Sequence, residues 1–98
     1  MVRIREMEHS LNETEAALRR LNAALDAYEQ VQPSVALLSA YLGSEEWRQD
    51  LAADEKGLLP TDLHRGVLSE DGIWNLLEEN RDLALRMAAM ANTVLKNK

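Results

Sequence analysis

The sequence predicts an all-α fold, a helical bundle that forms a single domain over residues 1–98. Three observations support this prediction. Apolar residues recur at alternating spacings of three and four in two long segments, as they do on one face of an α-helix. Leu and Ala, which favour helix, are the most frequent apolar residues, whereas β-branched apolar residues are scarce. Serine, glycine and proline residues near the segment ends are typical signals for starting and stopping helices.

The first long helix is predicted over about 2–31. Its apolar seam consists of Ile4, Met7, Leu11, Thr14, Leu18, Leu21, Leu25 and Tyr28. Small residues flank this seam at seven-residue intervals, among them Ala17 and Ala24. The buried stripe is therefore about three positions in seven, a width that suits a bundle better than a simple two-stranded coil.

Two short helices are expected next. Pro33 lacks a main-chain donor and disfavours helix at the residue before it, so it should end the first helix and open a second over about 33–42. Gly43 should stop that helix. Ser44 should cap a third helix over about 44–56, because its hydroxyl can accept a hydrogen bond from a free amide of the first turn.

The chain between 58 and 68 is predicted to be an irregular loop with one helical turn that ends at Gly66. Ser69 should then start the last helix, over about 70–97. Its seam consists of Ile73, Leu76, Asn80, Leu83, Met87, Met90 and Val94. Because the two long helices have similar lengths and short connections between them, we expect them to pack antiparallel along their seams.

Composition excludes several classes of function. The net charge of −6 disfavours binding to a phosphate backbone, so no nucleic-acid partner is expected. No apolar run approaches the length of a membrane span, so no membrane association is expected. The chain has no cysteine and no apolar signal core near its start, which together favour a cytoplasmic protein.

The sequence contains no pattern typical of an enzyme or a cofactor site. It lacks a glycine-rich phosphate loop, a serine elbow and a His-Glu-x-x-His motif. We therefore expect no enzymatic activity, no catalytic residues, no resident metal and no cofactor.

Chemically versatile side chains concentrate in the third helix and the loop after it. His64 lies between Asp62 and Arg65, but no second His or Cys stands at ligand spacing. Arg65 could bind an acidic ligand, or it could pair with a nearby carboxylate and fix the loop. Trp47 and Trp74 could anchor a partner or fill the end of the bundle. The candidate interaction or ligand residues are Trp47, Asp50, Asp62, His64, Arg65, Glu70, Asp71 and Trp74.

The same region carries a resemblance to a known family. The stretch from Tyr41 to Asp50 and the stretch from Gly57 to Leu77, together with the opening Arg3–Glu8, resemble a bacterial family known only as domain of unknown function 4298. Members commonly have Lys where this chain has His64. The resemblance covers nearly the whole chain, and it implies a small helical bacterial protein without implying an activity.

Two hypotheses for function follow. The first is a non-enzymatic protein–protein interaction module, which could form a homodimer or another oligomer, because two long apolar seams occur without any catalytic constellation. The alternative is a protein that binds a small ligand or a metal at the 58–71 loop.

Overall fold

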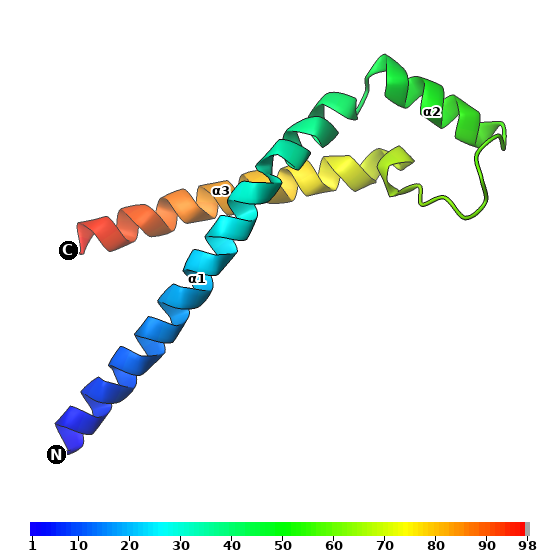
Figure 1. The fold of residues 1–98 in the computed structure, drawn as a ribbon. Coiled ribbons are helices and arrows are strands. Elements are labelled where there is room, and N and C mark those ends of the chain that lie inside the picture. The colour runs from blue at the N-terminus through cyan, green and yellow to red at the C-terminus, as the bar shows by residue number, and fades with distance from the viewer. Residues whose placement is uncertain (98) are drawn as a thin grey trace. The chain divides into compact units, whose positions relative to one another are not determined.

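The structure is a computed structural model that describes residues 1–97, apart from the side chain of Glu70. These residues form the helices α1 (Val2–Tyr41), α2 (Glu45–Glu55) and α3 (Glu70–Lys96), and the short 3-10 helix η1 (Gly66–Leu68) (Figure 1). The described residues contain no strand, so the predicted all-α class is confirmed. The chain divides into two compact units, Met1–Ser34 and Val35–Lys98. That both belong to a single domain stays a prediction.

The prediction of a helix break at Pro33 is wrong. Pro33 lies inside α1, so the helices expected over 2–31 and 33–42 are one continuous helix. Proline removes one main-chain donor but leaves the preceding and following turns able to bond, and the chain has no glycine before the end of α1. In the turn before Pro33, the Nε2 of Gln32 donates a hydrogen bond to the carbonyl oxygen of Tyr28 at 3.1 Å.

The first unit is a single helical segment, and its apolar seam is exposed. Exposed fractions of its aliphatic residues run from 37% for Leu25 to 62% for Ile4, whereas Tyr28 at the end of the seam is half-buried. One helix cannot cover its own apolar face, so this seam has no core of its own to enter. The predicted bundle of four helices with two long antiparallel members therefore does not match the structure, in which the described residues form three α-helices.

The second unit has a small core around η1. Leu68 of η1 and Ile73 of α3 are its buried apolar residues within the described part of the chain. η1 contacts both α2 and α3. Figure 1 shows the loop that leaves α2 and brings the chain back through η1 to the start of α3. This loop therefore places the 58–71 residues beside the core of the unit.

The predicted caps of α2 and α3 are confirmed. Ser44 Oγ accepts a hydrogen bond from the Trp47 amide at 3.1 Å, and Ser69 Oγ accepts one from the Gly72 amide at 3.0 Å. Each serine thereby satisfies one amide of the first turn that has no partner inside the helix.

A glycine follows the end of α2. Gly57 has a φ of +70°, in the left-handed region that glycine adopts without steric cost. Its amide donates to the carbonyl of Asp54, and the next amide, of Leu58, donates to the carbonyl of Ala53. This pair of hydrogen bonds is the Schellman arrangement, which closes a helix and turns the chain away from its axis.

The helical turn predicted within the loop is displaced. It was expected to end at Gly66, but η1 begins there. The Ser69 hydroxyl explains the shift, because it donates to the Gly66 carbonyl at 3.0 Å while it also caps α3. η1 and the first turn of α3 are thus held together by one side chain.

Position 72 requires glycine because the backbone of η1 lies very close to the first turn of α3 there. A Cβ built on Gly72 would overlap the carbonyl oxygen of Gly66 and stand 2.7 Å from Ser69 Oγ. We expect Gly72→Ala to lower the free energy of unfolding by about 1–3 kcal/mol, a typical cost of overpacking. That cost exceeds the roughly 1 kcal/mol by which Ala is favoured over Gly in a helix.

Gly66→Ala is the matched control for this prediction. A Cβ on Gly66 would meet no atom within 4 Å, so this variant should unfold at or slightly above the wild-type temperature. Thermal unfolding followed by tryptophan fluorescence reports directly on the second unit, which contains Trp47 and Trp74. Equal unfolding temperatures for the two variants would show that the close approach at Gly72 is absent.

Candidate functional site

One face of α2 makes the polar contacts that hold the loop and the end of α1. Trp47, Asp50 and Asp54 lie at spacings of three and four along α2, which places them on the same side of the helix. Each makes a contact with a residue outside α2. The candidate site is built around these three side chains.

Trp47 attaches α2 to η1. Its indole Nε1 donates a hydrogen bond to the Val67 carbonyl oxygen at 3.0 Å, and the side chain is half-buried. Trp47 thus fills space beside the loop and satisfies its polar atom there, as buried tryptophans usually do. The structure thus shows Trp47 in contact with its own chain, and its role as an anchor for a partner stays a prediction.

Asp50 joins α2 to the end of α1. The Tyr41 hydroxyl donates to Asp50 Oδ2 at 2.6 Å. This hydrogen bond, burial and the nearby charges of Asp50 and Glu46 together raise the pKa of Tyr41 from 10.0 to about 12. Ionisation would remove the shared proton and place a second negative charge beside the carboxylate.

Arg65 links the loop to α2. Its Nε lies 2.7 Å from Asp54 Oδ1, and its Nη2 donates to the Pro60 carbonyl oxygen at 2.8 Å. Both side chains of the ion pair are about one-third exposed. The guanidinium therefore bridges the loop to α2, and its positive charge is already matched by a carboxylate.

His64 lies at two apolar hollows of the second unit. One, of about 460 Å³, is lined by Leu38, His64, Gly66, Val67, Gly72, Ile73 and Leu76. The other, of about 310 Å³, is lined by Tyr41, Asp50, Leu59, Leu63, His64, Val67 and Leu68. Both are open to solvent, and His64 and Val67 belong to both. The loop thus covers the core of the unit but leaves concave apolar surface on either side of His64.

The remaining candidate residues do not join this group of contacts. Asp62, Asp71 and Trp74 are exposed, with Trp74 at 56%. The side chain of Glu70 lies outside the described part of the chain. Among the described residues, no group of three or more His, Cys, Asp or Glu side chains is placed to hold a metal ion.

Two residues with specific contacts were not among the candidates. Tyr41 and Asp54 hold Asp50 and Arg65 respectively. The sequence does place Asp54 one turn after Asp50 on the same helical face, but the partner of that face lies 11 residues further along the chain, at Arg65. Sequence spacing within a helix does not predict a contact of that kind.

The Tyr41–Asp50 hydrogen bond predicts a specific pH dependence. The folded-state pKa of Tyr41 is raised, so the stabilisation from this bond is complete below about pH 10 and is lost as the pH rises through about 12. Asp50→Asn should move the pKa of Tyr41 back toward 10.0, because it removes the negative charge and leaves a neutral amide oxygen, which is a weaker acceptor. The tyrosinate absorbance of a Tyr28→Phe chain, which retains Tyr41 alone, measures this directly. An unchanged pKa of Tyr41 after the Asp50→Asn substitution would show that Asp50 is not the cause.

A family model described as a domain of unknown function, DUF4298, matches residues 4–90. The chain belongs to this family. The DUF4298 match includes α2, the loop and nearly all of α1, which agrees with the resemblance seen in the sequence. Comparisons with curated proteins and with solved structures gave no match for this DUF4298 chain. None of the helices within residues 1–97 combines the length and the hydropathy that a membrane span requires.

Proposed function

We propose that this DUF4298 protein is a cytoplasmic, non-enzymatic protein–protein interaction module that works as a homodimer. The interaction surface is the seam face of α1, defined as Ile4, Met7, Leu11, Thr14, Leu18, Leu21, Leu25 and Tyr28. The observation that carries the proposal is the exposure of this face from Ile4 to Leu25.

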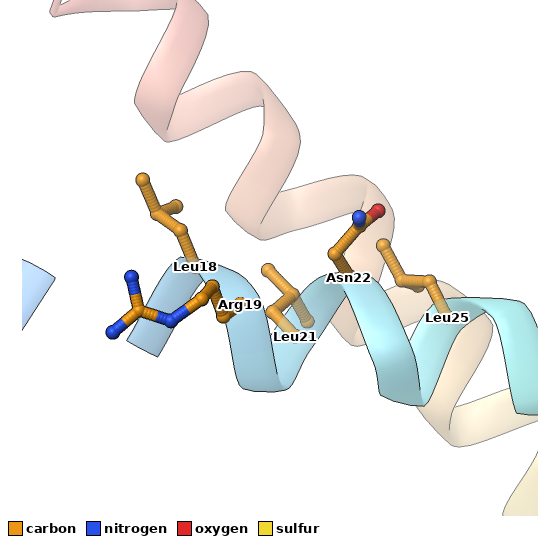
Figure 2. Close-up of a pocket in the computed structure, with 5 residues that line it drawn as sticks. All are labelled: Leu18, Arg19, Leu21, Asn22 and Leu25. Carbon is orange, nitrogen blue, oxygen red and sulfur yellow. The ribbon is translucent and has the colours of Figure 1, made fainter. Parts of the chain in front are cut away.

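The seam face is both apolar and continuous. Leu18 is 59% exposed, Leu21 54% and Met7 60%, although they lie on one side of a regular helix. Figure 2 shows Leu18 and Leu25 projecting from the same side of α1, where they and their neighbours line an open depression of about 410 Å³. Exposed leucines that occur singly are ordinary, but a row of them along a helix marks an interaction surface.

The energetics of helix formation also support an interaction through the seam face. Most helical stability in proteins comes from packing of an apolar face rather than from helix propensity. The first unit is one helix, so its stability depends on something that covers the seam face. A second copy of the chain provides a matching apolar face at equal concentration.

Light scattering coupled to size-exclusion chromatography tests the proposal. The mass should rise from 11.1 kDa toward twice that value as the concentration increases. A chain that keeps a mass of 11.1 kDa at every concentration, and that retrieves no protein from a lysate, would contradict it.

The hollows beside His64 favour a second candidate function, the binding of a small apolar ligand at the loop. Their lining includes Leu38, Leu63, Val67 and Ile73, which would surround an apolar group, while His64 could offer a hydrogen bond. Thermal shift measurements against fatty acids, aromatic compounds and divalent metals test this function. No shift with any of them would exclude ligand binding at the concentrations used.

A further inference from the structure

We infer that two copies of the chain pair through the seam face of α1 as a parallel, in-register coiled coil. This inference rests on the proposed function and adds the identity of the partner and its direction. It follows from the charges that border the seam face and from the one small polar residue within it.

Two columns of side chains border the seam face. One column consists of the residues that immediately precede Ile4, Leu11, Leu18 and Leu25, namely Arg3, Ser10, Ala17 and Ala24. The other consists of the residues that immediately follow Met7, Thr14, Leu21 and Tyr28, namely Glu8, Glu15, Asn22 and Glu29. All of these residues are exposed in the structure, so they are available at the edges of an interface.

A parallel pair brings the first column of one copy beside the second column of the other, offset by five residues. Arg3 then lies beside Glu8 of the second copy, and symmetry repeats this attraction on the opposite edge. The remaining positions of the first column are small and uncharged. Parallel pairing therefore gives opposite charges at one end of the seam face and no like-charge contact along it.

In an antiparallel pair, each column lies beside the same column of the second copy, and the two columns run in opposite directions. Three of the four residues in the second column are Glu, so carboxylates would face carboxylates. Like charges across a helix interface are repulsive and select against that orientation. The charges bordering the seam face thus favour the parallel pair.

Thr14 favours the in-register arrangement. It is a polar residue in an otherwise apolar stretch of the seam face, between Leu11 and Leu18. A polar residue within a coiled-coil seam fixes register when it meets its own equivalent, because any shift places it against an apolar side chain. In the in-register parallel pair, Thr14 faces Thr14 of the second copy.

Cysteine cross-linking of the full chain tests orientation, since the natural sequence has no cysteine. Met7→Cys and Leu25→Cys each introduce one thiol on the seam face, near opposite ends of it. In the parallel pair each variant should form disulfide-linked dimers with itself under a glutathione redox buffer. A mixture of the two variants should give few links between position 7 and position 25, which lie roughly 27 Å apart along the helix.

Ala23→Cys is the control, because position 23 lies on the face of α1 opposite the seam. Self-linking of Met7→Cys and Leu25→Cys at least about tenfold faster than that of Ala23→Cys supports the parallel pair. Links that form only in the mixture would show an antiparallel dimer, which overturns the inference and leaves the proposed function standing.

Two further outcomes also overturn the inference. A doubled mass without any linking above the Ala23→Cys level would place the dimer interface away from the seam face. A single-chain mass together with no linking would remove the proposed function as well.

Discussion

Replacing Leu21 with alanine is expected to raise the dissociation constant of the homodimer by about a thousandfold. Each dimer loses two leucine side chains from its interface, and each loss costs about 2 kcal/mol when the side chain is buried there. The two losses together, roughly 4 kcal/mol, correspond to about a thousandfold change in the dissociation constant. Sedimentation equilibrium of the wild-type and variant chains measures it.

Leu37→Ala is the matched control for this prediction. Leu37 belongs to the same helix and is 72% exposed, but it lies on the face opposite the seam. The two substitutions remove the same atoms and have similar effects on helix propensity. Only the Leu21 variant should weaken the dimer. Equal dissociation constants for Leu21→Ala and Leu37→Ala would show that the seam face is not the interface.

Replacing Ile73 with alanine is expected to lower the free energy of unfolding of the second unit by about 2–5 kcal/mol. Ile73 is 3% exposed, the lower of the two values among the buried apolar residues described. It lies in the first turn of α3, beside the loop that carries Leu68. Because this core is small, few other contacts remain to compensate for the lost side chain. Urea unfolding followed by tryptophan fluorescence measures the change.

Leu85→Ala provides the comparison within α3, since Leu85 is 57% exposed. The free energy of unfolding of this variant should stay within about 0.5 kcal/mol of the wild-type value. If the Ile73 variant also stays within that limit, the core around η1 does not stabilise the second unit.

The ends of α2 and α3 could be predicted from the sequence because their signals are local. A serine that caps a helix bonds to an amide three residues away, and a glycine that stops one adopts its own positive φ. Ser44, Ser69 and Gly57 act in this way in the structure. None of these interactions depends on a distant segment.

The helix through Pro33 could not be predicted in the same way. A proline inside a helix either kinks it or breaks it, and the residue type alone does not show which of the two occurs. Here the nearest glycine comes after α1 ends, and the Gln32 side chain adds a hydrogen bond just before the proline. The expected short helix over 33–42 was therefore the continuation of α1.

The candidate site was predicted by residue type but not by contact. The residue types of Trp47, Asp50 and Arg65 are ones that often bind ligands or partners, and each makes a contact within the chain. Fixing the loop is one of the two roles that the sequence leaves open for Arg65, and binding of a ligand or partner stays a prediction. Periodicity shows which residues share a helical face, but it does not show what that face meets. The seam face of α1 illustrates the same limit, because its spacing predicted packing, but the expected antiparallel pairing with the last helix does not match the structure.

Amide hydrogen exchange across residues 2–34 tests most directly whether the seam face of α1 is covered by a second copy. Exchange there should slow by about tenfold or more when the protein concentration rises through the dissociation constant, because dimerisation stabilises the helix. The Leu21→Ala chain at the same concentrations should keep fast exchange in this segment. Identical exchange of both chains at every concentration would contradict the proposed homodimer.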